Sequence, residues 1–188
     1  MLRRAEIAVC WALGFGLLAQ AFAAAADERE PISLPPEVKE RFMTEMRGHM
    51  GNLDDILAAL AEGDFAEAAN VAEIHMDFGH SMWSTMMEQG MSAEQILAAK
   101  KQMRAKGMGM GQGQGQGMGH GMGQGMGRFM TEDFRSMGAT FHEAATAFAT
   151  RARQAASPPT AADYKETTEV LQAVTSTCRA CHDSFRVE

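Results

Sequence analysis

The strongest constraint on the fold is the spacing of apolar residues, which recur every three or four positions in four separate segments. This period places apolar side chains on one face of an α-helix. The segments span residues 36–63, 64–90, 131–157 and 160–185. An alternating run of β-branched residues, which would predict a strand, does not occur in the sequence. We therefore predict an all-α protein that folds as an antiparallel four-helix bundle.

Capping residues mark where several of these helices start. Thr160 and Asp163, three residues apart, have the spacing of a capping box, in which each side chain bonds to the other residue's backbone N–H. Ser92 and Gln95 have the same spacing. We therefore predict a fifth, short helix that starts at Ser92 and ends near Lys106.

Two glycine features interrupt the helical pattern. Gly79 lies in the middle of the second helix, where it costs ~1 kcal/mol relative to alanine and permits a close approach or a kink. In residues 107–127 every second residue is glycine, and the others are Met, Gln and His120 only. This composition has high backbone entropy and little apolar bulk, so we predict a mobile linker between helices two and three.

The first 26 residues have the pattern of a secretory signal peptide. A basic start is followed by an uncharged apolar run from Ile7 to Phe22 and by four alanines, with cleavage expected before Asp27. Residues 27–188 would then form one exported domain, which we place in the periplasm. Loss of the leader takes the net charge from −7 to −8, because Arg3, Arg4 and Glu6 leave with it. Such an acidic chain argues against nucleic acid and anionic membrane surfaces as partners.

The motif Cys178-Arg-Ala-Cys181-His182 carries the chemistry of the chain. Cys-x-x-Cys-His is the signature for thioether attachment of a c-type haem. On a helix, positions i, i+3 and i+4 project from one face, so both sulfurs and the imidazole point the same way. We predict one covalent haem, with His182 as the proximal iron ligand. A zinc site or a thiol redox site fits less well, because Cys10 is lost with the leader and no other cysteine remains.

The C-terminal segment Cys178 to Arg186, at the end of the last of four helices, resembles the cytochrome c prime family. Arg41 and the Met-rich first helix that leads into residues 60–65 are also similar to that family. Residues 92–127 have no counterpart in it that we identify. The resemblance implies a four-helix bundle around one haem, with a residue from the first helix on the distal side of the iron.

The identity of that distal residue stays open in the sequence. Counting back from Gly63 reaches Arg47, which cannot ligate iron. We choose Met46 as the sixth ligand, because it lies on the apolar stripe of the first helix with Phe42 and Leu57. Other donors within a small register shift are Met43, His49 and Met50, and a vacant sixth site is a further alternative.

Two arginines are candidates for contacts with the haem. Arg186 is four residues after His182 and would share its face on a continuous helix, near the iron or a propionate. Arg41 would pair with a propionate. For both, simple solvent exposure is the alternative interpretation.

Methionine and histidine are unusually concentrated along the chain, which holds 17 methionines. His75, His80 and Met82 would share the second helix, and a second group lies in residues 107–127. Thioethers suit Cu(I) and imidazoles suit Cu(II), so copper handling is one functional hypothesis. Ordinary core packing and compositional drift are the alternative.

Electron transfer to redox partner proteins is our first functional hypothesis, and binding of a small gas (NO or CO) at a vacant distal site is the second. No acid–base pair or activated nucleophile in the sequence indicates an enzyme. Bundles of this type often pair through two helices, so a homodimer is compatible with the chain.

Overall fold

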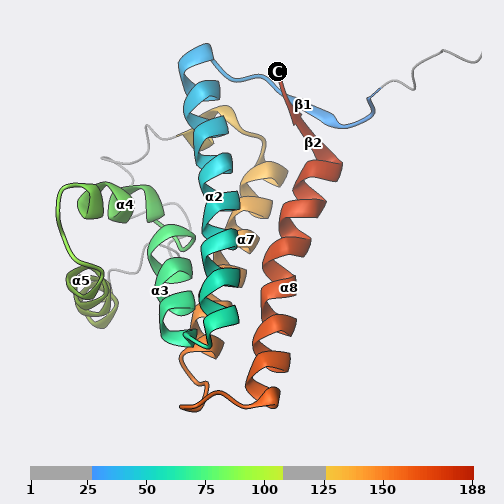
Figure 1. Cartoon of the computed structure of the whole chain (residues 1–188). Coiled ribbons are helices and arrows are strands. Elements are labelled where there is room, and N and C mark those ends of the chain that lie inside the picture. The colour runs from blue at the N-terminus through green and yellow to red at the C-terminus, as the bar shows by residue number, and fades with distance from the viewer. Residues whose placement is uncertain (1–26, 108–125) are drawn as a thin grey trace, which may run out of the picture.

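The computed structural model describes residues 27–107 and 126–188 (Figure 1). These residues are largely helical, which confirms the prediction of an all-α helical bundle. The elements are β1 (Glu30–Ile32), α2 (Pro36–Glu62), α3 (Phe65–His75), α4 (His80–Glu88), α5 (Ala93–Ala105), the short 3₁₀ helix η1 (Met126–Phe129), α7 (Glu132–Ala152), α8 (Ala161–Ser184) and β2 (Phe185–Val187).

The helix ends follow from local sequence. α2 stops at Gly63, whose φ of 78° is in the left-handed region that glycine adopts at low cost. The capping boxes expected at Ser92 and Thr160 both form, with Gln95 and Asp163 as their partners. The fifth short helix is therefore confirmed as α5.

Helices α2, α3, α7 and α8 lie side by side and form the main body of the molecule (Figure 1). α2 packs on α3, α3 on α7, and α7 on α8, whereas α2 and α8 are not among the helix pairs in extended contact. Their shared core is formed by small and apolar side chains, among them Ile56, Ala68, Phe148 and Val174.

The second predicted helix is wrong as a continuous element. It breaks between His75 and His80, where Gly79 adopts a φ of 75°. α4 and α5 instead fold back beside α3 around Ile74, Trp83 and Ile96. His75 and Met82 consequently lie on different helices, and the expectation that they share one helix is wrong too.

Buried charges hold α5 on the bundle. Asp77 accepts a hydrogen bond from Thr146 Oγ1 of α7 at 2.8 Å, and its other oxygen lies 3.1 Å from Lys100 Nζ and 2.8 Å from Arg104 Nη2. Asp77 and Lys100 are both buried. α5 is thus attached to the bundle by a specific polar network.

Two short strands tie the ends of the described chain together. β1 and β2 pair in parallel, with Glu30 opposite Phe185 and Ile32 opposite Val187. No strand was predicted here, because three residues are too few for an alternating pattern. Arg186 lies in β2 and not on α8, so the expectation that it shares a helical face with His182 is wrong.

The predicted signal peptide, residues 1–26, and most of the predicted linker, residues 108–125, lie outside the described residues. Within the part of the chain that is described, no helix is both long and apolar enough to cross a membrane.

Candidate functional site

The attachment motif lies in the last two turns of α8. Cys178, Cys181 and His182 are all helical, so the one-face spacing expected from the sequence holds. Cys178 packs against the main core, and Cys181 packs against a second cluster that contains Phe42, Phe134 and Phe185. Both thiols are unpaired, and the His182 side chain is exposed.

The electrostatics of the two cysteines do not favour thiolate chemistry. Burial raises the pKa of the Cys178 thiol, and burial together with the neighbouring Cys178 raises the pKa of Cys181. Reactive cysteines have lowered pKa values and electropositive surroundings. The pair therefore suits covalent attachment of a group better than redox cycling or nucleophilic catalysis.

Helix α2 presents adjoining parts of its inner face to different partners. Glu45, His49 and Asn52 contact α3 and α4, through Ser81, His80 and the carbonyl oxygen of His75. Met46, one turn before His49 and about 60° from it around the helix, packs against the cluster that Cys181 also contacts. Met46 thus shares an apolar cluster with the attachment motif, whereas His49 is engaged with His80.

Exposed apolar residues extend the Met46 side of α2. Met43, Met50 and Leu57 recur every seven residues and so lie on one stripe. Their exposed fractions are 40%, 63% and 55%, high for large apolar side chains. Leu57 was expected in the core, and its exposure shows that this stripe lacks a covering element among the described residues.

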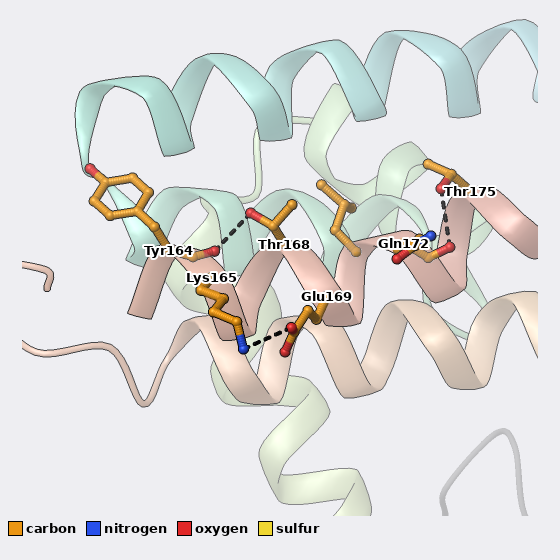
Figure 2. A pocket seen from close by; sticks show the side chains of 7 residues that line it. Tyr164, Lys165, Thr168, Glu169, Gln172 and Thr175 are labelled. Atoms are coloured by element: carbon orange, nitrogen blue, oxygen red, sulfur yellow. Dashed lines mark hydrogen bonds and ion pairs between the residues drawn. The ribbon is translucent and has the colours of Figure 1, made fainter. Parts of the chain in front are cut away.

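A groove follows the face of α8 that is turned toward α2 (Figure 2). Its volume is about 650 Å³, and it is lined from Tyr164 through Leu171 to Thr175, one turn before Cys178. The groove is lined by side chains of α8, among which Leu171 is apolar and Lys165 and Glu169 are charged.

A second groove of about 680 Å³ runs between α7 and α8, where Thr140, Thr177 and Ala180 line it. Ala180 and His182 lie two positions apart and so point to nearly opposite sides of α8. This second groove is therefore on the wrong side of the helix for a ligand held by His182.

The residues present fit a haem c. Cys178 and Cys181 would hold its edge by thioether bonds, and His182 would ligate its iron. The exposed stripe of α2 supplies apolar surface for a macrocycle, and Met46 supplies a thioether on the same side. The two cysteines and the histidine are the residues that attachment of a c-type haem requires.

The two arginines remain predictions. Arg41 is largely exposed and its Nε lies 3.4 Å from Glu45 Oε1. Arg186 pairs with Glu188 at 3.0 Å, while its Nε is buried without a hydrogen-bond partner among the described residues.

A histidine cluster outside the motif was not found by sequence reasoning. His49 of α2, His80 of α4 and His142 of α7 meet between these three helices. Burial lowers the pKa of His49 to about 3 and that of His80 to about 4, and the neighbouring histidines add to both shifts. Burial also lowers the pKa of His142. Because the three histidines come from three separate helices, they have no short, regular spacing in the sequence. No sequence motif could therefore have indicated this cluster.

Comparison with known proteins supports the attachment motif directly. The family model described as Cytochrome C' matches residues 119–186, which include α7, α8 and the Cys-x-x-Cys-His sequence. The resemblance inferred from the sequence is confirmed over this part of the chain, and α2 and α3 lie outside the match. No curated protein and no solved structure matches significantly.

Proposed function

Since the part of the chain that holds its attachment motif matches the cytochrome c prime family, we propose that this protein is an exported, periplasmic c-type cytochrome that transfers single electrons through one haem. The observation that carries the proposal is the placement of Cys178, Cys181 and His182 on one face of α8, with both cysteines against the core. When bound there, a haem c supplies a one-electron Fe(III)/Fe(II) couple.

The chain's own residues have separate tasks in this proposal. Cys178 and Cys181 fix the group by covalent bonds, so that it cannot dissociate during redox cycling. His182 supplies the proximal nitrogen, and Met46 supplies the sixth ligand from α2. A methionine in this position raises the reduction potential and limits ligand rearrangement on electron transfer.

Spectroscopy of the haem-loaded protein tests the proposal. Colour that remains with the protein after acid–acetone extraction would show covalent attachment. A low-spin reduced spectrum that carbon monoxide leaves unchanged would support a fixed sixth ligand and electron transfer. Colourless protein from a host competent in cytochrome maturation, with both thiols open to alkylation, would refute the haem assignment itself.

Gas binding is the second candidate function, and one observation favours it. Met46 packs in an apolar cluster with Phe42 and Phe134, and methionines in such clusters commonly serve only as packing. The sixth site would then be vacant and open to NO or CO. A high-spin spectrum that changes on addition of carbon monoxide would establish this function in place of electron transfer.

A further inference from the structure

We propose that His49 and His80 form a binding site for a divalent transition-metal ion of the Zn²⁺ type, separate from the haem. The Nε2 atoms of the two imidazoles lie 3.3 Å apart, and they come from different helices, α2 and α4. Two nitrogens that each bind one ion at roughly 2.0–2.1 Å and lie this far apart subtend nearly a tetrahedral angle. The pair therefore has the separation of two ligands on a tetrahedral ion.

The hydrogen bond between the two rings does not provide a partner for every ring nitrogen of His49 and His80. One proton shared between two Nε2 atoms uses one donor and one acceptor. His80 Nδ1 is buried and has no partner among the described residues, so no hydrogen bond there opposes either tautomer of this ring. With Nδ1 protonated, His80 Nε2 presents a lone pair toward His49 Nε2, where an ion would bind.

A third imidazole lies next to the pair. The His142 ring centroid is 5.2 Å from that of His80, and His142 Nδ1 is 2.8 Å from the carbonyl oxygen of Met76. A carbonyl only accepts, so Nδ1 carries the hydrogen and the Nε2 lone pair of His142 is available. Metal-binding histidines are commonly oriented in this way by a backbone carbonyl.

The surroundings supply negative charge and exclude most water. Glu45 is one turn before His49 on α2 and accepts a hydrogen bond from Ser81 Oγ, the residue after His80, at 3.1 Å. Phe141 stacks on His49 at 4.8 Å between ring centroids, and Phe78 lies against His142. Among the described residues no three His, Cys, Asp or Glu side chains already form a metal cage, so the site is a pair that water or His142 completes.

Calorimetric titration of the haem-loaded, chelator-treated full protein with ZnCl₂ tests the proposal. We expect one saturable site in the wild type and about 100-fold weaker binding in His49→Gln and in His80→Gln. Matched controls are His75→Gln, whose ring instead bonds to Ser84 Oγ at 2.9 Å, and His120→Gln in the glycine-rich tract; both should bind like the wild type. Equal binding by all four variants, or equal loss in the His75 control, would overturn the site.

X-ray absorption at the zinc edge of the wild-type complex gives a second readout that does not depend on a variant's folding. We expect the multiple-scattering pattern of at least two imidazoles at roughly 2.0–2.1 Å from zinc. A first shell of oxygen atoms alone would contradict the proposal. Because neither readout involves iron, failure here leaves the proposed haem function untouched.

Discussion

At the scale of single residues, Met46 and His49 lie one helical turn apart on α2 and have different contact partners. Met46 packs against the cluster that Cys181 also contacts, whereas His49, three residues later on an adjoining part of the helix surface, is hydrogen-bonded to His80. In this conformation His49 is already engaged. Met43 and Met50, the other methionines of this stretch of α2, are 40% and 63% exposed.

We predict that Met46→Ala converts the haem-loaded protein from a low-spin to a high-spin form that binds carbon monoxide, because the thioether ligand is removed. Visible spectra of the reduced protein, with and without carbon monoxide, measure this. Met50→Ala is the matched control, since Met50 is 63% exposed, and its spectrum should match the wild type. A low-spin Met46→Ala protein would exclude Met46 as the ligand.

Asp77 is the residue on which the docking of α5 most depends. We predict that Asp77→Asn lowers the free energy of unfolding by about 3 kcal/mol, because the buried Lys100 loses its carboxylate partner. Guanidinium denaturation measures the change. Asp183→Asn breaks only the exposed pair with Arg179 and should change the free energy of unfolding by less than ~1 kcal/mol. Equal effects of the two substitutions would contradict the structural role of Asp77.

At the scale of elements, sequence predicted helix starts better than helix continuity. The side chains of Asp64, Thr131 and Thr160 accept bonds from backbone N–H groups three residues on, and this is local chemistry that a sequence displays. The break at Gly79 depends instead on tertiary packing, because α4 turns away to cover Ile74 with Trp83. The apolar period alone continues through the break and so predicted one long helix.

The sign of the stability change caused by one substitution distinguishes a helix that breaks at Gly79 from a continuous helix. We predict that Gly79→Ala destabilises the protein by about 1 kcal/mol, since alanine at a φ of 75° is strained. In a continuous helix the same change would stabilise by about 1 kcal/mol. Thermal or chemical denaturation of the variant measures the sign, and a stabilised protein would favour the unbroken helix.

At the scale of the whole molecule, two carboxylates make stability depend on acid pH. Burial alone would raise the pKa of Asp77, but Lys100 and the hydrogen bond from Thr146 outweigh it and lower that pKa. Hydrogen bonds from Thr160 and Arg151 lower the pKa of Asp163. Both groups release their protons more readily in the folded state than in the unfolded one.

The contribution of these two carboxylates to the free energy of unfolding should therefore be complete well above pH 3.8, the ordinary value for both groups, and be lost as the pH drops below it. The buried histidines His49, His80 and His142, whose pKa values are lowered from 6.5, should make the free energy of unfolding fall already as the pH drops below 6.5. Denaturation between pH 6 and pH 2 measures this dependence. In Asp77→Asn the fall should be shallower, since one of the two carboxylates is absent. A steeper or identical fall in that variant would contradict the assignment.

Removal of the haem should affect the whole bundle, because the apolar stripe of α2 would stay open to water. We predict that protein expressed without haem maturation unfolds at lower denaturant concentration and binds the dye ANS, which reports exposed apolar surface. The haem-loaded protein should bind little dye. Equal stability and dye binding would show that the group does not cover this stripe.

The attachment motif could be predicted from sequence because three residues in five positions contain it. The histidine cluster and the open stripe of α2 could not, because both depend on how separate helices meet. Leu57 illustrates the difference: its helical period matches that of Leu60, yet it is 55% exposed while Leu60 is buried. Periodicity identifies an apolar face but not the element that covers each part of it.

The pairing of β1 with β2 has a consequence for the space between α2 and α8. These helices have little contact with one another, yet the two strands adjoin their neighbouring ends and are joined by backbone hydrogen bonds. At this end of the bundle, the distance between α2 and α8 is thus held by the main-chain pairing of β1 with β2. The three residues that link β1 to α2, Ser33 to Pro35, therefore connect this main-chain pairing directly to the first turn of α2.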